Sequence, residues 1–248
     1  MFFGPTGLYL ANITTTFGQS NLAGKVIIIL LVAGSIMAWS IMITKWRALS
    51  EARRQSRAFL DTYRKEDHPL ALFLRRTKYE ASPAFQIYSH VCTDLAAVLE
   101  ARGVDSDDLF MGEVGMQLPQ LNTRQLGQIR NVAERTMADE VLLLEDSMGM
   151  LATAVSAAPF LGLLGTVWGV MDAFGSMGQA GGGSVLITEV GPGIAGALAT
   201  TVIGLIVALP SLVGYNLLSN TIRKMSVEMD NFVQEFSADL EGYFSDDA

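Results

Sequence analysis

The chain has 248 residues, of which 50% are hydrophobic and 17% are charged, and its mean hydropathy is +0.34. It is too apolar and too lightly charged for an ordinary soluble domain, and a disordered chain is excluded. The net charge of −8 argues against a nucleic-acid partner, since such partners are held by basic side chains that neutralise phosphates.

The chain has few residues of the kinds that bind metals or form disulfides. Its single cysteine, Cys92, has no disulfide partner within the chain and is expected to be a reduced, structural residue. Its two histidines, His68 and His90, lack the spacing of metal ligands. No metal or other cofactor is therefore predicted.

Three long stretches carry no Asp, Glu, Lys or Arg. They are residues 26–44, 147–171 and 190–222, with lengths of 19, 25 and 33 residues. A helix rises about 1.5 Å per residue, so roughly 20 residues cross a hydrocarbon core of about 30 Å. The sequence predicts an all-α polytopic membrane protein with three transmembrane helices, of which the last is long enough to project into the cytoplasm.

Basic residues indicate the orientation of these spans. The segment between the first two runs holds 14 Lys and Arg, the segment between the last two holds none, and only Lys25 precedes the first run. Lys and Arg near span ends are retained on the cytoplasmic side, so the N-terminus is predicted outside and the C-terminus inside. A stop-transfer cluster follows the first run: Lys45, Arg47, Arg53, Arg54 and Arg57. A cleaved signal peptide is disfavoured, because residues 1–24 hold no basic residue and no cleavage site follows the apolar run.

The charge pattern divides the chain into seven predicted segments. They are a periplasmic N-terminal segment (1–25), transmembrane helix 1 (26–44), a cytoplasmic helical domain (45–146), transmembrane helix 2 (147–171), a periplasmic loop (172–189), transmembrane helix 3 (190–218) and a cytoplasmic amphipathic helix (219–248).

The large segment 45–146 has apolar positions at helical spacing. The pattern continues without a breaker from Arg135 into the second span, which predicts one long helix through this point. The acidic residues on this stretch fit a solvated helix face. No nucleotide-binding glycine loop, Ser/His/Asp set or pocket-like pair of carboxylates is found, so the chain is not expected to be an enzyme.

The C-terminal segment predicts an amphipathic helix. Its apolar residues recur every three or four positions, with one step missing at Asp239. They are Ile222, Met225, Met229, Phe232, Phe236 and Tyr243. Two interpretations stay open at this point: the stripe packs on the chain's own long helices, or it forms a seam between subunits.

Small residues crowd the second and third spans and allow helix backbones to approach closely in lipid. Two prolines in the spans would each remove a backbone hydrogen bond and bend the helix, which predicts some polar interior. The residues assigned to helix packing are Gly162, Gly165, Gly169, Gly193, Gly196, Pro159 and Pro210. Among the few polar side chains of the spans, Thr166 lies between two of these glycines and is the preferred residue of a polar pathway, although most threonines in membranes only bond their own helix.

Two strings in these spans resemble the signature of a known family. PFLGLLGTVWGVMDAF (159–174) and GPGIAGALATTVIGLIVALPSLVGYN (191–216) are similar to the two signature spans of the TolQ/ExbB/MotA family of proton-driven motor stators. The predicted topology agrees with that family. The exit of the first span (MAWSIMITKWRAL, 37–49) and the tail (DNFVQEFSADL, 230–240) resemble TolQ more than ExbB.

The resemblance implies a homopentamer in the inner membrane of a Gram-negative bacterium. The ring would surround a dimer of a single-span partner similar to TolR or ExbD, and a protein similar to TolA or TonB would join it. Proton flow down the proton motive force would move the partner relative to the ring. The proton-pathway residues carried over from the family, with their neighbour Thr200, are Thr166, Thr201, Phe160 and Asn216.

The chain departs from the family at Gly196, where relatives usually carry a glutamate. No ionisable residue lies in the middle of any predicted span. A proton relay in hydrocarbon needs a titratable group, so the carboxylate is expected to come from an Asp in the partner's span, with threonine hydroxyls and water completing the path.

Other functions stay open. A passive membrane scaffold would only organise other proteins and would not respond to uncouplers. A small-solute transporter is disfavoured, because three spans without an inverted repeat are visible. The sequence does not separate a TolQ-type role in the Tol-Pal system, in envelope integrity and cell division, from an ExbB-type role in outer-membrane nutrient uptake; the first is favoured.

Overall fold

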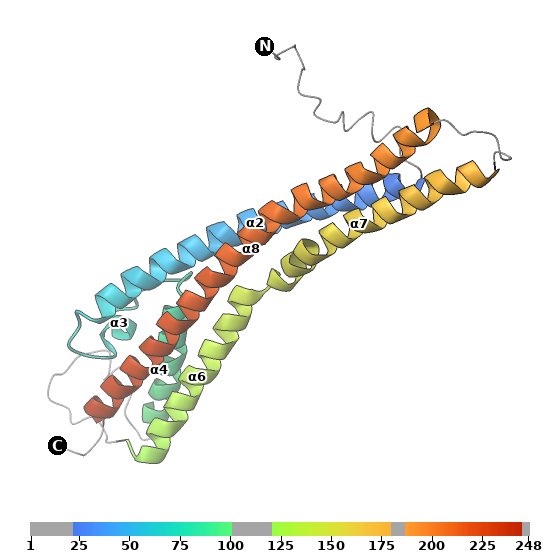
Figure 1. Cartoon of the computed structure of the whole chain (residues 1–248). Coiled ribbons are helices and arrows are strands. Elements are labelled where there is room, and N and C mark those ends of the chain that lie inside the picture. The colour runs from blue at the N-terminus through green and yellow to red at the C-terminus, as the bar shows by residue number, and fades with distance from the viewer. Residues whose placement is uncertain (1–21, 101–120, 180–186, 245–248) are drawn as a thin grey trace, which may run out of the picture. The chain divides into compact units, whose positions relative to one another are not determined.

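The computed structural model describes residues 22–100, 121–179 and 187–244, and every regular element within these ranges is a helix (Figure 1). The all-α class is confirmed. Residues 1–21 of the predicted N-terminal segment and the centre of the predicted loop 172–189 lie outside the described residues. The helices are α2 (Leu22–Tyr63), α3 (Ala71–Leu74), α4 (Pro83–Glu100), α6 (Thr123–Glu145), α7 (Met148–Gln179) and α8 (Ile187–Phe244).

Three helical stretches are long and apolar enough to cross a membrane, which confirms that prediction. They lie within Leu22–Tyr63, Thr123–Ser176 and Val190–Phe244. Many large apolar side chains on them are exposed on the single chain; Ile36 is 68% and Ile206 is 61% exposed. Such a surface is unfavourable in water and fits contact with lipid or with another chain.

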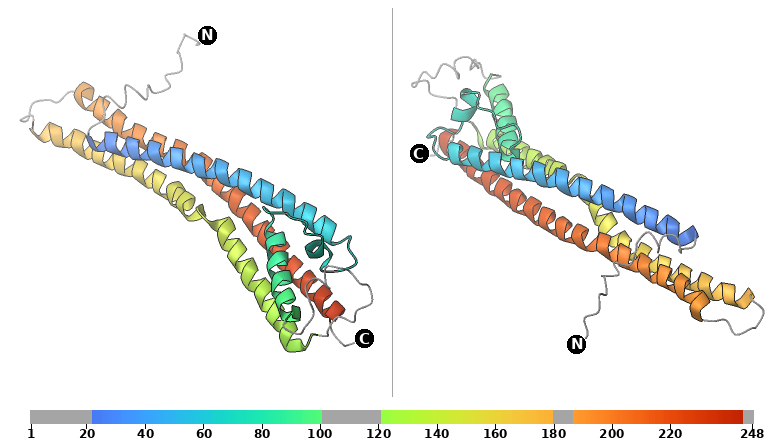
Figure 2. Two further views of the ribbon diagram at one scale, coloured as in Figure 1. Left: turned by 180° about the vertical axis from the view of Figure 1, so that it is seen from behind. Right: turned by 90° about the horizontal axis from the view of Figure 1, so that it is seen from above.

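The chain divides into two compact units, and the first comprises residues 1–44 and 147–217. Within it, Leu31 of α2 packs with Ala158 of α7 and Ala208 of α8. Met42 of α2 lies directly against Gly214 of α8, where a Cβ would collide with its side chain. Both views of Figure 2 show α7 and α8 side by side over this part of the chain.

The second unit comprises residues 45–146 and 218–248 and has an aromatic core. Phe59 and Tyr63 of α2, Tyr88 of α4, and Phe232 and Phe236 of α8 are each at most 4% exposed. Neighbouring ring centroids in this cluster are 5.2 to 6.1 Å apart, mostly in tilted or edge-to-face geometry. This cluster joins the three helices.

Two helices of this unit, α4 and α6, begin at side-chain caps. Asn122 and Gln125 form a reciprocal capping box at the start of α6. The Ser82 hydroxyl accepts a 3.1 Å hydrogen bond from the Phe85 amide at the start of α4, and Pro83 follows it in the first turn, where proline is tolerated.

The apolar stripe of the C-terminal segment packs on the chain's own helices. Met225, Met229 and Phe232 are at most 2% exposed, whereas Tyr243 is 43% exposed. Asp239, the polar step in the stripe, accepts a 2.6 Å hydrogen bond from the Tyr63 hydroxyl. Of the two interpretations left open by the sequence, packing within the chain is the one that the structure shows.

The predicted continuous helix into the second span is wrong. Helix α6 ends at Glu145 and α7 begins at Met148. Between them, Asp146 has a ψ of 143°, and Ser147 has a φ of 61°, in the left-handed region that is unfavourable for a residue with a Cβ. Lys45 stabilises the end of α6, because its Nζ donates to the carbonyls of Leu143 and Leu144 at 3.3 Å, which the helix end leaves without their usual partners.

Candidate functional site

A seam of small residues joins α7 and α8 in the first unit. The helices run antiparallel, so each step forward along α7 is matched by a step back along α8. The facing positions are Ala173 with Gly193, Gly169 with Ala197, Gly165 with Thr200, Gly162 with Thr201 and Gly204, and Ala158 with Gly204. We call this set the small-residue seam.

Three glycines in the seam, Gly165, Gly169 and Gly204, leave no room for a side chain. A Cβ at Gly169 would lie 2.6 Å from the Ala197 Cβ, and a Cβ at Gly204 would lie 2.7 Å from the carbonyl oxygen of Ala158. Both distances are far below van der Waals contact. The backbones are therefore as close as glycine permits, as expected where helices associate in lipid without a hydrophobic driving force.

Three hydroxyl groups converge on one backbone carbonyl of this seam. The hydroxyls of Thr166, Thr200 and Thr201 lie 3.2, 3.1 and 3.0 Å from the carbonyl oxygen of Gly162. The Thr166 and Thr201 hydroxyls also hydrogen-bond each other. Thr166 and Thr200 reach the carbonyl of Ala197 as well, at 3.2 and 2.7 Å. We call these three threonines the hydroxyl cluster.

The protons in the hydroxyl cluster have more than one arrangement. Each hydroxyl donates one proton and accepts through two lone pairs. Thr166 therefore donates to only one of its three partners at a time: the Thr201 oxygen, or the carbonyl of Gly162 or Ala197. Such hydroxyls can reorient around a water or a carboxylate, but they do not hold an extra proton themselves.

The three threonines of the hydroxyl cluster differ in solvent exposure. Thr200 is 1% exposed, while Thr166 and Thr201 are only partly buried. Thr200 is thus enclosed between the two helices, and the pair formed by Thr166 and Thr201 lies at the open side of the seam.

The other residues predicted for the pathway lie elsewhere on these helices. Phe160 is 72% exposed. Asn216 is exposed and follows Thr201 by 15 residues on α8, which is about 22 Å along the helix axis. The structure does not bring either residue to the hydroxyl cluster.

The predicted packing residues lie within continuous helices. Helix α7 continues through Pro159, and α8 continues through Pro210. Gly196 is buried in α8. Next to Pro210, the buried Ser211 donates a 2.8 Å hydrogen bond to the carbonyl of Val207.

Sequence reasoning missed two close approaches in the first unit. Gly214, which accommodates Met42 of α2, was not among the predicted packing residues, and neither was Gly204, which lies against the Ala158 carbonyl. The signal was available, since a glycine inside a long apolar helix often marks a close helix contact.

No charged side chain takes part in this site. Residues 26–44, 147–171 and 190–222 hold no Asp, Glu, Lys, Arg or His. In the part of the chain that the structure describes, no group of three His, Cys, Asp or Glu residues is placed to hold a metal ion. The hydroxyl cluster is a polar site without a titratable group of its own.

The cysteine and one histidine are structural in the second unit. Burial raises the pKa of the Cys92 thiol, which keeps it protonated and unreactive. Burial lowers the pKa of His68, whose Nδ1 accepts a 2.9 Å hydrogen bond from the Leu70 amide. Neither group lies at the hydroxyl cluster.

Residues 107–231 match the MotA/TolQ/ExbB proton channel family. The chain belongs to this family. The matched range contains the hydroxyl cluster and the small-residue seam. Membership makes the chain a multi-pass membrane protein of channel type and not an enzyme, as the sequence predicted.

Sequence identities to individual relatives indicate which branch of the family the chain resembles. The Tol-Pal system protein TolQ of Haemophilus influenzae is 29% identical over 231 residues, covering 92% of this chain and 93% of that protein. TolQ of Pseudomonas aeruginosa is 27% identical over 90% of this chain and 89% of its own length. The biopolymer transport protein ExbB of Xanthomonas campestris is 31% identical over 89% of this chain and 81% of its own. The chain is therefore of the TolQ/ExbB type, as its signature strings predicted.

Proposed function

We propose that this chain is the TolQ-type stator subunit of an energy-transducing complex in the inner membrane of a Gram-negative bacterium. Proton flow down the proton motive force through the complex moves a single-span partner similar to TolR. The partner, together with a protein similar to TolA, acts in envelope integrity and cell division.

The observation that carries this proposal is the convergence of three hydroxyls on the Gly162 carbonyl. The cluster lies in an apolar helix pair with no charged residue between positions 190 and 222. Burying polar groups in hydrocarbon is costly unless they are satisfied or serve a pathway. Thr166 and Thr201 are the members at the open side of the seam, so we assign the pathway to them and give Thr200 a positioning role.

The titratable group of the pathway comes from the partner. A proton relay in hydrocarbon needs a group that binds and releases protons, and this chain's uncharged runs supply none. An Asp in the partner's span, facing Thr166 and Thr201, provides it. Each proton that crosses 100 mV then releases about 2.3 kcal/mol for motion of the partner.

Assembly and orientation belong to the same proposal. Five copies of this chain surround two copies of the partner, with the N-terminus in the periplasm and the C-terminus in the cytoplasm. The orientation is supported by the 14 Lys and Arg between the first two uncharged runs and by their absence between the last two.

The test is proton flux in liposomes that contain the chain and its co-purified partner. Thr166→Val and Thr201→Val each keep the side-chain shape but remove the hydroxyl, and we expect potential-driven proton uptake to fall at least tenfold in both. Thr153→Val is the matched control, because the Thr153 hydroxyl bonds only the Gly149 carbonyl of its own helix at 2.9 Å. Full flux in both test variants would overturn the pathway.

A passive scaffold is the competing function. It predicts that the valine variants and uncouplers leave the phenotype of the cell unchanged. Native mass spectrometry of the complex adds a second test, since a purified assembly that holds no single-span protein with a membrane Asp leaves the pathway without its titratable group.

An ExbB-type role is the second candidate, supported by the 31% identity to ExbB of Xanthomonas campestris. The TolQ-type role is favoured by coverage: the matches span 93% and 89% of two TolQ proteins, but 81% of ExbB from Xanthomonas campestris and 56% of ExbB from Pseudomonas putida. A deletion strain separates the two. Delayed constriction of the outer membrane supports the TolQ-type role, and loss of outer-membrane nutrient uptake supports the ExbB-type role.

A further inference from the structure

Two groups of basic residues in the second unit differ in their partners. Four arginines form ion pairs within the unit: Arg54 with Glu51, Arg64 with Glu235, Arg75 with Glu66, and Arg130 with Glu134. In contrast, five cations near the ends of the uncharged runs form no ion pair or hydrogen bond with any described residue. These are Arg47, Arg53 and Arg57 on α2, and Arg223 and Lys224 on α8.

Two of the unpaired cations of α2, Arg53 and Arg57, lie on one stripe of the helix with Trp46, whereas Arg47 lies about 100° around the helix from Trp46. Trp46, Arg53, Arg57 and Arg64 are spaced by seven, four and seven residues, which places them along one stripe of the helix. Arg64, at the end of this stripe, donates hydrogen bonds of 2.8 and 2.9 Å to Glu235 of α8. The stripe therefore runs along the edge of the α2 face that packs on α8, with Trp46 and Arg57 exposed.

The two cations of α8 lie level with those of α2. Helices α2 and α8 run parallel in this unit, since Phe59 packs on Phe232 and Arg64 pairs with Glu235. In these pairs the α8 residue is numbered 173 and 171 higher than its α2 partner. The same offset places Lys224 beside the level of Arg53, with Arg223 next to it. Both are exposed.

Little negative charge opposes this group. Glu51 is the one acidic residue in 45–60, and none lies in 218–227. Glu51 is engaged by Arg54 at 2.9 Å and by Gln55 at 2.6 Å. The Arg53 Nε is buried without a hydrogen-bond partner. Asp61 and Glu228 follow Arg57 and Lys224 by four residues, one helix turn, but form no ion pair with them. These cations are therefore not paired within the described residues.

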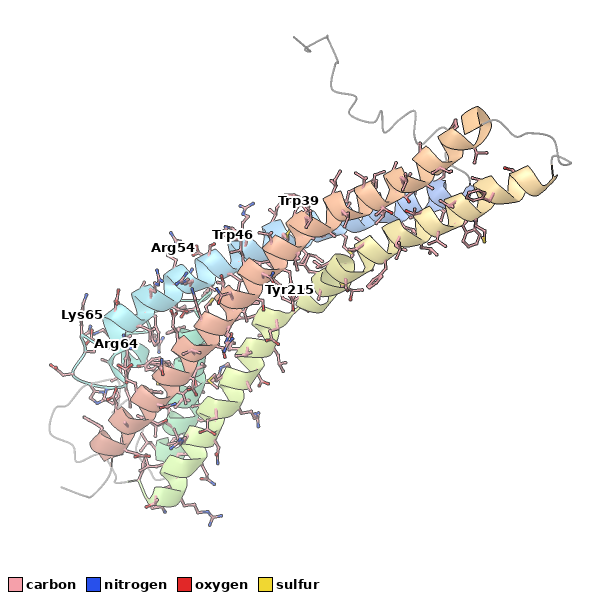
Figure 3. The ribbon with its side chains drawn as sticks, in the orientation of Figure 1. Trp39, Trp46, Arg54, Arg64, Lys65 and Tyr215 are labelled. Carbon is pink, nitrogen blue, oxygen red and sulfur yellow. The ribbon has the colours of Figure 1, made fainter. Side chains whose placement is uncertain are left out.

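The position of Trp46 indicates that these cations lie near the membrane–water interface. It is 56% exposed and comes two residues after the first uncharged run. Figure 3 shows Trp46 and Arg54 extending outward from α2. Exposed tryptophans at span ends are typical of the interface between hydrocarbon and water. Side chains on a helix lean toward its N-terminus, so these arginines lean back toward the uncharged run and the membrane.

We propose that Trp46, Arg47, Arg53, Arg57, Arg223 and Lys224 form a binding surface for the headgroup of an anionic phospholipid. Guanidinium groups bind phosphate oxygens through paired, charge-assisted hydrogen bonds, and the indole N–H adds a donor. A net negative headgroup matches five unpaired cations, whereas a zwitterionic headgroup carries its own compensating ammonium.

The test uses the full chain with its co-purified partners in mild detergent. Equal amounts of phosphatidylglycerol and phosphatidylcholine are added, and native mass spectrometry measures which lipid the assembly retains. We expect the wild type to prefer phosphatidylglycerol. The double variant Arg47→Gln, Arg57→Gln should lower this preference about 30-fold, which corresponds to about 2 kcal/mol at roughly 1 kcal/mol per cation.

The matched control removes two charges that are not part of the proposed surface and lie on another helix. Arg124→Gln, Arg135→Gln on α6 neutralises two exposed arginines and should leave the preference unchanged. Arg47→Lys, Arg57→Lys should retain most of it. If the first variant does not assemble, Arg223→Gln, Lys224→Gln on α8 should show the same loss. An unchanged preference in an assembled test variant, or an equal loss in the control, overturns the proposal.

Discussion

Gly165 on α7 lies so close to Thr200 on α8 that a Cβ at position 165 would be 2.8 Å from the Thr200 Cβ. Thr200 fills the space left by the missing side chain, and its hydroxyl lies within hydrogen-bonding distance of carbonyls on both helices. This pair sets the distance between the helices that carry the hydroxyl cluster. A side chain at position 165 must push the helices apart or distort the cluster.

Substitution of Gly165 by alanine should disturb both stability and function. We expect Gly165→Ala to lower the free energy of unfolding by about 1–3 kcal/mol through overpacking, measured by thermal unfolding in detergent. Proton flux in the reconstituted complex should fall with it. Gly175→Ala is the matched control on α7, because a Cβ there meets nothing within 4 Å. Equal effects of the two substitutions would contradict the role of the small-residue seam.

Thr166 and Thr201 should be energetically coupled, because their hydroxyls bond each other. A double-mutant cycle with Thr166→Val and Thr201→Val compares the free energies of unfolding of the single and double variants. It should give a coupling free energy of about 0.5–1.5 kcal/mol. Thr153→Val combined with Thr201→Val should be additive, because Thr153 bonds only its own helix. Additivity in the first pair would mean that the two hydroxyls do not interact in the assembled protein.

The parts of the fold that follow from local pattern were predictable from the sequence. Uncharged runs specify long apolar helices, and small residues at helical spacing specify close packing between two of them. Gly162, Gly165 and Gly169 were assigned to packing on this basis, and each lies in the seam. Thr166 was selected because glycines flank it, and its hydroxyl does reach the neighbouring helix.

The parts that depend on distant residues were not predictable. The helix break at Asp146 and Ser147 contains no proline or glycine that would predict it. The cation at the end of α6 is Lys45, 98 residues away from Leu143 in the sequence. Asp239 interrupts an apolar stripe for a reason that lies 176 residues away, in the hydroxyl of Tyr63. Periodicity shows which face of a helix is apolar. It does not show which side chain of another helix bonds a polar residue on that face.

The bond between Tyr63 and Asp239 gives a prediction on stability. Tyr63 is 4% exposed, and burial together with the Asp239 carboxylate raises the pKa of its phenol. Asp239→Leu should lower the free energy of unfolding by about 1–3 kcal/mol, because it leaves a buried hydroxyl without an acceptor. The double variant Tyr63→Phe, Asp239→Leu should recover most of this loss.

The neighbouring ion pair is the comparison for that prediction. Arg64 and Glu235 are joined by two short hydrogen bonds, but the arginine side chain is 54% exposed. Arg64→Gln should therefore cost no more than about 1 kcal/mol. Arg64→Gln could instead lower the free energy of unfolding more than Asp239→Leu does. That result would show that the ion pair stabilises the packing of the stripe more than the hydrogen bond of the Tyr63 hydroxyl does.

His68 should make the stability of the second unit depend on pH. Its Nδ1 accepts a 2.9 Å hydrogen bond from the Leu70 amide, and its ring packs edge-on against Tyr243 with centroids 4.4 Å apart. Burial lowers the pKa of His68, so the unfolded chain takes up the proton first as the pH falls below about 6.5. The stabilisation is present above that pH and is lost as the pH falls toward the pKa of the folded state. His68→Asn keeps a side-chain acceptor for the Leu70 amide but removes the titrating imidazole. The fall in melting temperature between about pH 7.5 and 5.5 should therefore be smaller in this variant than in the wild type. An identical slope for wild type and His68→Asn would contradict the assignment to His68.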